Sequence, residues 1–257
     1  MEHRSLRVSR EDRFSVVTLM RPEKRNALSE EVLSELRDTL GQVGDSPARG
    51  VILAAEGPVF SAGHDFGDMA GRDLDAMRRL LSLCSEVMQS IQRMPQPVCA
   101  QVEGLATAAG CQLVASCDLA VAGESARFAV PGGRGGWFCT TPGVALARAV
   151  SRKRALEMLL TGDPIDAHTA AEWGLVNRVA PDTAVAQETR NLLGLATRGS
   201  AASKALGKRV FYQQIDLPLA EAYAEAGEAM AQASQTDAAR EGMTAFLEKR
   251  KATFGDR

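Results

Sequence analysis

Histidine is scarce in this chain of 257 residues, and its five cysteines form no close pair. The three histidines are far apart in the sequence, and no H-E-x-x-H motif is present. Because metal sites usually draw on closely spaced histidine and cysteine ligands, this pattern predicts no bound metal. An odd number of cysteines without a C-x-x-C pair predicts reduced thiols rather than disulfides. The residues concerned are His3, His64, His168, Cys84, Cys99, Cys111, Cys117 and Cys139.

The chain also lacks a surplus of positive charge. It has 30 lysines and arginines against 32 aspartates and glutamates, so it offers little basic surface to release counterions from a nucleic acid. Its formal net charge is -2 and 45% of its residues are hydrophobic, which is typical of a globular protein. We therefore expect no nucleic-acid partner.

No hydrophobic run is long enough to cross a bilayer. The most apolar stretch, residues 98–123, is interrupted by polar side chains, whereas a spanning helix needs about 20 mostly apolar residues in a row. The first five residues lead directly into a strand-like segment and lack the apolar core of a secretory signal. The sequence therefore predicts a cytoplasmic protein with no membrane partner.

Strand-like and helix-like segments alternate through the first two thirds of the chain. Residues 5–10 and 14–20 are rich in β-branched side chains and predict a hairpin. Ser29 is a potential helix cap, because apolar residues recur after it at helical spacing, and residues 73–93 carry one long apolar stripe. Further strands are expected at 51–55, 98–102 and 118–122, and further helices at 111–116, 143–150, 152–160 and 167–172.

The last third of the chain, from Pro181 to Lys251, is nearly all helical in pattern and rich in alanine and glutamate. Alternating strands and helices predict an α/β fold. The terminal helices hold few residues large enough for a core of their own, so they must dock on the body of the chain or on a neighbouring subunit. We expect one structural domain, with residues 1–195 as its core and residues 196–257 as a helical extension.

Two tight turns stand where a strand is expected to lead into a helix, at Phe60–Asp65 and at Ala108–Gln112. Small residues there let a ligand approach the backbone closely, and the first N–H groups of a helix are unpaired donors reinforced by the helix dipole. Two such groups aimed at one point would form an oxyanion hole. The alternative is that glycine and alanine serve only close packing of a helix on a strand.

Two weaker features point to other chemistry. The glycine cluster at residues 132–136 has no Walker lysine and no G-x-G-x-x-G spacing, so a turn over a pocket is favoured over a phosphate loop. Cys139 and His64 would form a nucleophilic pair only if the fold brought them together, and no residue to orient such a pair is evident. A buried thiol is the favoured interpretation of Cys139.

Several longer motifs occur together in one order. They are RPEKRNAL at 21–28, FSAGHD at 60–65, GLATAAGCQL at 104–113 followed by Cys117 and Asp118, TGDPI at 161–165 and AAEWGLV at 170–176. In order and spacing these motifs resemble the crotonase superfamily, the enoyl-CoA hydratases and isomerases, over nearly the whole chain. The resemblance implies a ClpP/crotonase-like spiral of ββα units whose C-terminal helices build a disc-shaped trimer, often paired into a hexamer.

The same resemblance implies a site. The carbonyl of an acyl-CoA thioester would accept hydrogen bonds from the main-chain N–H groups of His64 and Ala109, which would stabilise an enolate or a tetrahedral oxyanion. Coenzyme A would be part of the substrate, with no permanently bound cofactor. The adenine, pantetheine and phosphates would lie against other residues of the matched motifs and against the C-terminus. These are Lys24, Arg25, Ala27, Ala62, Gly63, Asp65, Phe66, Leu105, Thr107, Gly110, Pro131 and Lys249.

The chain departs from the family at the two residues that perform hydration. Members that add water to a double bond use two glutamates, and the matching positions hold Gln112 and Gly132. An amide exchanges no proton near neutral pH and glycine has no side chain, so classical hydration is expected to be weak or absent. Gly132 is also expected to widen the pocket. The other candidates for proton transfer are His64, Asp65, Asp68 and Glu103, while Thr140 and Thr141 stand where some relatives place an acid.

Three functions remain open at this point. The favoured one is a lyase or isomerase that acts on an acyl-CoA with an unusual acid or base, as in fatty acid metabolism. The second is a noncatalytic acyl-CoA-binding protein. The third is a structural or regulatory trimer with a vestigial pocket. Retention of the coenzyme A loop alongside loss of the glutamates favours the first two over the third.

Overall fold

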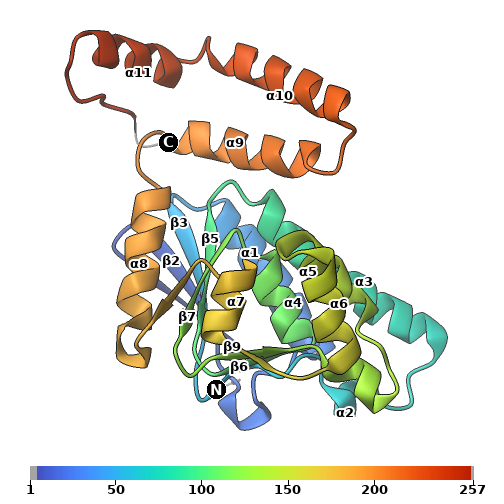
Figure 1. The fold of residues 1–257 in the computed structure, drawn as a ribbon. Helices are drawn as coiled ribbons and strands as arrows, with labels where there is room; N and C mark the ends of the chain where they lie inside the picture. The colour runs from blue at the N-terminus through green and yellow to red at the C-terminus, as the bar shows by residue number, and fades with distance from the viewer. Residues whose placement is uncertain (1–4, 256–257) are drawn as a thin grey trace.

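A computed structural model describes residues 5–255 and has two sheets enclosed by helices (Figure 1). The larger sheet has six strands in the order β1-β2-β3-β5-β7-β10. The first two form the predicted antiparallel hairpin, and the others join it in parallel. The strands are β1 (Leu6–Glu11), β2 (Phe14–Leu19), β3 (Gly50–Ala55), β5 (Val98–Val102), β7 (Leu119–Gly123) and β10 (Arg178–Ala180).

A second sheet of four very short strands has the order β4-β6-β8-β9. Strands β4, β6 and β8 run parallel, and β9 pairs antiparallel with β8. The sequence did not predict these strands, because two or three residues are too few to show the alternation of a strand. They are β4 (Val59–Ser61), β6 (Leu105–Thr107), β8 (Arg127–Ala129) and β9 (Ile165–Asp166).

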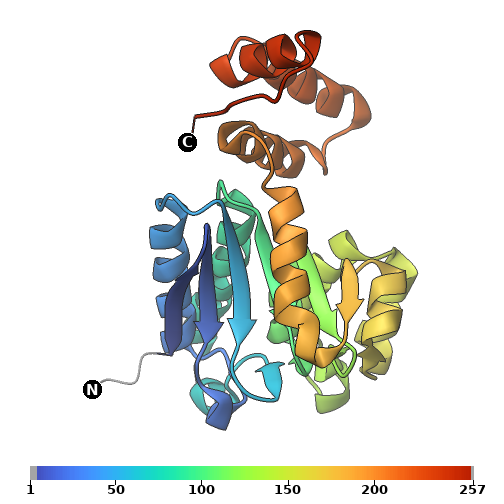
Figure 2. The same ribbon diagram turned by 90° about the vertical axis from the view of Figure 1, so that its left-hand side faces the viewer.

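Helices cover both faces of the larger sheet (Figure 2). Helices α1 (Glu30–Gly44), α3 (Leu74–Arg93) and α4 (Ala109–Ser116) share one hydrophobic core, whereas α8 (Val185–Ala196) packs on the opposite face. The predicted start of α1 is confirmed, because Ser29 accepts a hydrogen bond from the N–H of Val32 at 3.3 Å.

Shorter elements complete the core. Helix α5 begins three residues before its predicted start, and the glycine cluster forms a 3-10 turn, η2. These elements are α2 (Phe66–Met69), α5 (Thr140–Ala149), α6 (Arg152–Thr161), α7 (Ala167–Trp173), η1 (Pro22–Lys24), η2 (Pro131–Gly135) and η3 (Asp182–Ala184).

Helices α9 (Ala201–Gln214), α10 (Leu219–Ala233) and α11 (Asp237–Leu247) lie together at one end of the molecule (Figure 1). Lys208 of α9 is only 8% exposed and its Nζ lies 2.6 Å from Oδ2 of Asp118, while Tyr212 donates to Oδ1 of Asp118 at 2.9 Å. Helix α9 therefore docks on the body of its own chain. The predicted boundary after residue 195 falls near the end of α8, and the division into two parts stays a prediction.

Within residues 5–255, no helix is long and apolar enough to span a membrane. All five cysteines are free thiols. The same described residues contain no group of three or more histidine, cysteine or acidic side chains that would hold a metal ion. His3 lies outside the described residues.

Candidate active site

A cavity of about 360 Å³ lies between the turn after β4, the start of α4 and the segment 131–142. This volume is within the range typical of small-molecule sites. Both residues predicted to supply main-chain donors, His64 and Ala109, line it. The other lining residues are Ala62, Phe66, Leu81, Thr107, Ala108, Pro131, Gly132, Gly135, Trp137, Phe138, Cys139, Thr140, Thr141 and Pro142.

The two predicted turns are in direct contact. A Cβ atom added to Gly63 would lie 3.0 Å from the main-chain nitrogen of Ala109 and 2.9 Å from Cβ of Ala108. Gly63 also has a φ of +84°, which side chains rarely adopt. A Cβ at Gly110 would likewise overlap the carbonyl oxygen of Ser61. Glycine is therefore required at both positions, and the backbones of the two turns touch.

Ala108 has an unusual conformation that sets the direction of the following peptide group. Its φ is 51° and its ψ is -118°, which for a residue with a side chain costs about 1–3 kcal/mol. It is held there by hydrogen bonds, because its N–H donates to Ala129 at 2.9 Å and its carbonyl accepts from Gln112 at 3.0 Å. The N–H of Ala109, which begins α4, has no acceptor within residues 5–255. This strain could not be predicted from the sequence, because alanine gives no signal of it.

The N–H of His64 is held by pairing with the segment before α1. The N–H of Leu28 donates to the carbonyl of Gly63 at 2.8 Å, and the N–H of Asp65 donates to the carbonyl of Leu28 at 3.4 Å. The His64 N–H lies between these two bonds and has no acceptor in the described part of the chain. Together with Ala109, it provides a second unpaired donor at the cavity.

Asn26 fastens the predicted coenzyme A loop to β4. Its buried side chain accepts from the N–H of Arg21 at 2.9 Å and donates to the carbonyls of Glu56 and Val59 at 2.9 and 2.8 Å. Lys24 and Arg25 are exposed on the same loop. These contacts of Asn26 were not predicted from the sequence, although asparagine is one of the few residues that readily adopts its φ of 50°.

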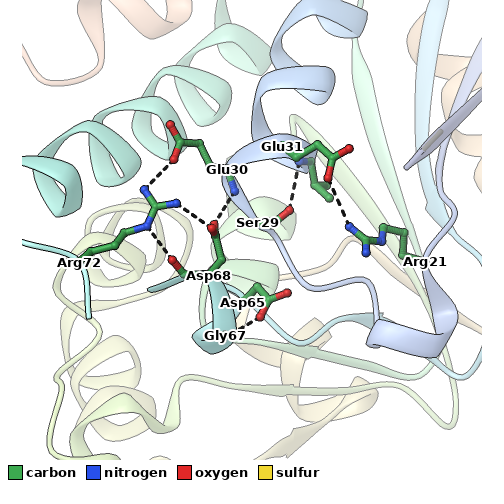
Figure 3. Close-up of polar contacts among 9 residues, drawn as sticks. Arg21, Ser29, Glu30, Glu31, Asp65, Gly67, Asp68 and Arg72 are labelled. Atoms are coloured by element: carbon green, nitrogen blue, oxygen red, sulfur yellow. Dashed lines mark hydrogen bonds and ion pairs between the residues drawn. The ribbon is translucent and has the colours of Figure 1, made fainter. Parts of the chain in front are cut away.

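A network of charges holds α2, which follows the His64 turn, against the start of α1 (Figure 3). Asp68 accepts from the N–H of Glu30 at 2.8 Å and from Arg72 at 2.7 Å, and Arg72 also pairs with Glu30 at 2.6 Å. Burial alone would raise the pKa of Asp68, but these hydrogen bonds outweigh it and the pKa lies below its usual value. Asp68 is therefore an ionised structural residue.

Two other predicted proton-transfer candidates also have structural contacts. Asp65 caps α2 by accepting from the N–H of Gly67 at 2.9 Å (Figure 3). Glu103 is exposed and accepts from Gln101 at 2.8 Å. Neither residue lines the cavity.

His64 differs from these carboxylates because it is one of the residues that line the cavity. Its Nε2 atom is buried and has no hydrogen-bond partner among the residues that the structure describes. Burial lowers the pKa of His64, and the opposing charge of Asp68 does not cancel this effect. The imidazole is therefore neutral near pH 7.

The two positions that match the family glutamates have different surroundings. Gln112 is 4% exposed on α4 and is absent from the cavity wall, and its Oε1 has no hydrogen-bond partner within the described part of the chain. A Cβ on Gly132 would lie 2.5 Å from Sγ of Cys139 and would overlap the carbonyl oxygen of Trp137. The expectation that Gly132 widens the pocket is therefore wrong, because Trp137 and Cys139 fill that space.

Cys139 and His64, which are distant in the sequence, line the same cavity. Burial raises the pKa of the Cys139 thiol, although a hydrogen bond from the N–H of Gly132 at 3.3 Å acts in the opposite direction. The thiol is thus protonated in the resting site.

The remaining predicted contact residues divide into two groups. Ala62, Phe66, Thr107 and Pro131 line the cavity, whereas Leu105, Gly110 and Ala27 are not part of its wall. Lys249 follows α11, which lies at the end of the molecule away from α2 (Figure 1). Within a single chain it does not approach this cavity.

The sequence matches a known protein family over most of its length. The profile described as Enoyl-CoA hydratase/isomerase matches residues 10–257. The chain belongs to this family. The human mitochondrial enoyl-CoA hydratase domain-containing protein 3 is 46% identical over 242 residues, which are 93% of this chain and 79% of that protein.

Solved structures show the same fold. The crystal structure of the human domain-containing protein 3 has a TM-score of 0.93 and 44% identity, and covers 97% of this chain and 100% of that chain. An enoyl-CoA hydratase structure from Mycobacterium smegmatis has a TM-score of 0.94 and 45% identity, with 98% and 99% coverage. The predicted crotonase fold of this hydratase/isomerase family member is confirmed. The human relative is named as mitochondrial, so the comparison does not support the predicted cytoplasmic location, which stays a prediction.

Proposed function

We propose that this family member binds an acyl-CoA thioester in the cavity and holds its carbonyl oxygen with the N–H groups of His64 and Ala109. The contact between Gly63 and Ala109 carries the proposal, because it brings two otherwise unpaired donors to one cavity. Donors preorganised in this way stabilise an enolate or tetrahedral oxyanion, and a single one contributes about 10²–10³-fold to a rate.

Classical hydration does not fit the cavity wall. Within the described chain, no aspartate or glutamate lines the cavity, and the positions of the two family glutamates hold Gln112 and Gly132. General acid–base groups typically contribute about 10²–10⁴-fold each. We therefore propose a lyase or isomerase of acyl-CoA thioesters with weak or absent hydratase activity. The runner-up is a protein that binds the thioester without converting it.

The proposed coenzyme A contacts start from the exposed cations of the loop before α1. Lys24 and Arg25 stand on a loop whose residue Arg25 accepts a hydrogen bond from the N–H of Ala62 at 3.0 Å, so the loop is next to the His64 turn. Positive side chains here would attract the phosphates of coenzyme A. Lys249 would reach them only from a second copy of the chain.

Self-association as a trimer or hexamer is part of the same proposal. The terminal helices carry large apolar side chains on their surface. In a monomer these side chains would be in contact with water, whereas in an oligomer a neighbouring chain would cover them. Light scattering coupled to size exclusion is expected to give three or six times the chain mass, and a monomer would overturn this part. The side chains are Phe211, Leu219, Tyr223, Met230, Phe246 and Leu247, which are 51–82% exposed.

The proposed function is tested by calorimetric titration with butyryl-CoA, which has no double bond. The Gly63→Ala variant places a methyl group between the two turns and is expected to weaken binding at least about 10-fold, or 1.4 kcal/mol. Gly71→Ala is the matched control, because Gly71 also has a positive φ, of +80°, but a Cβ there meets no atom within 4 Å.

Binding by the wild type and by Gly71→Ala, with loss in folded Gly63→Ala, supports the proposal. Absence of binding to the wild type would overturn it. Equal binding by both variants would show that the contact between the two turns does not shape the site.

A further inference from the structure

Ser61, the last residue of β4, has a hydroxyl at the point where the predicted coenzyme A loop (residues 21–28) meets the His64 turn. Its side chain is fully buried. The hydroxyl donates to the main-chain carbonyl of Asn26 at 2.8 Å and accepts from the N–H of Gly63 at 3.2 Å. A serine hydroxyl is able to donate and to accept at the same time. A single oxygen atom therefore joins the loop to the turn that holds the His64 donor.

Ser61 is also close to the second turn. A Cβ added to Gly110 would lie 2.7 Å from Cβ of Ser61, so the end of β4 packs directly against the first turn of α4. Gly110 follows Ala109, whose N–H is the other proposed donor. Ser61 is thus next to both turns as well as to the loop of residues 21–28.

The direction of the His64 N–H depends on the hydrogen bonds of Gly63. The carbonyl of Gly63 accepts from the N–H of Leu28 at 2.8 Å, and the N–H of Gly63 donates to the Ser61 hydroxyl. Because the C=O and N–H of a trans peptide group point in opposite directions, the bond from Leu28 turns the His64 N–H away from residue 28. Gly63 has a φ of +84° and no side chain to restrict it, so these two bonds fix the orientation of its peptide groups.

The bonds of the Ser61 hydroxyl are the ones that a change of side chain removes directly. Main-chain N–H groups of Ala62 and Asp65 also donate to this loop, at 3.0 and 3.4 Å, and they remain after any substitution at residue 61. Without the hydroxyl, the carbonyl of Asn26 and the N–H of Gly63 would each lose a partner. A buried polar group without a partner costs free energy, so the turn would shift to pair these groups elsewhere.

We propose that Ser61 is a positioning residue of this site: its hydroxyl directs the His64 N–H toward the thioester carbonyl without touching the thioester, and this inference rests on the proposed function. Its effect is then specific to ligands that have a carbonyl oxygen at this place. A residue that only stabilises the fold would affect the binding of ligands with and without this oxygen by the same factor.

The experiment is calorimetric titration of the full chain with butyryl-CoA and with S-butyl-CoA, a thioether in which a CH₂ group replaces the carbonyl. The wild type is expected to bind butyryl-CoA more tightly. Ser61→Ala is expected to reduce this preference at least about 3-fold, because loss of one hydrogen bond weakens binding by up to about 10-fold. Ser116→Ala is the matched control and is expected to keep the preference. Ser116 is 2% exposed on α4, and its hydroxyl also donates to a main-chain carbonyl at 2.8 Å, that of Gln112.

The outcomes separate this inference from the proposed function. An unchanged preference in Ser61→Ala would overturn the positioning role and leave the proposed function standing, as would an equal fall in Ser116→Ala. A wild type that binds butyryl-CoA no more tightly than S-butyl-CoA would overturn the proposed contact with the carbonyl, and the positioning role with it.

Circular dichroism shows whether each variant is folded. Ser61→Cys is measured as well, so that the test does not depend on the folding of Ser61→Ala. A thiol is close to a hydroxyl in size but is a weak donor and a weak acceptor, so this variant is also expected to lower the preference for butyryl-CoA. The preference of the wild type in folded Ser61→Cys would contradict the positioning role.

Discussion

The main-chain N–H of Gly132 donates a hydrogen bond to Sγ of Cys139 at 3.3 Å, and the same sulfur would lie 2.5 Å from a Cβ at position 132. The segment after η2 therefore folds back on Gly132 and takes the space that a side chain would need. A protein with this backbone cannot regain a glutamate at position 132 by substitution alone. Atoms of Trp137 and Cys139 occupy that space instead.

Gly132→Ala is expected to destabilise the fold by about 1–3 kcal/mol, because the methyl group meets backbone as well as sulfur. Gly135→Ala is the control in the same turn, since a Cβ there meets nothing within 4 Å, and it is expected to change stability by less than about 0.5 kcal/mol. Urea unfolding followed by circular dichroism measures both. Equal losses in the two variants would contradict the close packing of Gly132.

Crotonyl-CoA hydration by the wild type is expected to be at least about 10³-fold slower than by a relative that has both glutamates, because no carboxylate from residues 5–255 lines the cavity. The rate of loss of the enoyl thioester absorbance measures this reaction. Hydration at the rate of the relative would show that another residue supplies the missing proton transfer.

The buried imidazole of His64 makes stability depend on pH. Burial lowers the pKa of His64 below 6.5 in the folded state, although the nearby Asp68 opposes the shift. Well above pH 6.5 the imidazole is neutral in both the folded and the unfolded state, and it contributes nothing to the pH dependence of stability. As the pH falls below 6.5 the unfolded chain binds the proton first, so the folded state loses stability.

His64→Gln is expected to reduce this loss, as measured by the free energy of unfolding one pH unit above and one below 6.5. Both measurements use the same buffer ions, so that only the protonation of the protein changes. If the variant loses as much stability as the wild type when the pH falls, other groups cause the pH dependence.

The ion pair between Lys208 and Asp118 is expected to anchor the terminal helices. Lys208→Met leaves the buried carboxylate without its cation and is expected to cost roughly 3–5 kcal/mol in free energy of unfolding. Arg148→Met is the control, because Arg148 pairs with Asp216 at 3.1 Å where both side chains are more than half exposed, and such pairs contribute at most about 1 kcal/mol. Similar losses in both variants would contradict the anchoring role.

Local patterns were sufficient to predict much of the core. Ser29 caps α1 as capping chemistry predicts, and the apolar stripe of α3 is long enough to predict a helix without ambiguity. The hairpin of β1 and β2 also follows from its own residues. The second sheet could not be predicted in this way, because its strands depend on neighbours distant in the sequence.

The candidate site also depends on contacts between residues that are distant in the sequence. The motifs and their resemblance to a family predicted that the His64 and Ala109 turns would meet, and the structure brings them together. The strain at Ala108 and the filled space at Gly132 depend on atoms placed by the folded chain. A sequence shows that glycine lacks a side chain, but it does not show that Cys139 folds back on it.

The central claim is that the main-chain N–H groups of His64 and Ala109 hold one thioester carbonyl. Isotope-edited Raman spectroscopy of butyryl-CoA labelled with ¹³C at the carbonyl measures this directly in the wild-type complex. Two hydrogen bonds polarise the carbonyl, so its stretching frequency is expected to be lower in the complex than in free butyryl-CoA in water. A frequency equal to or higher than that of the free thioester would contradict the account.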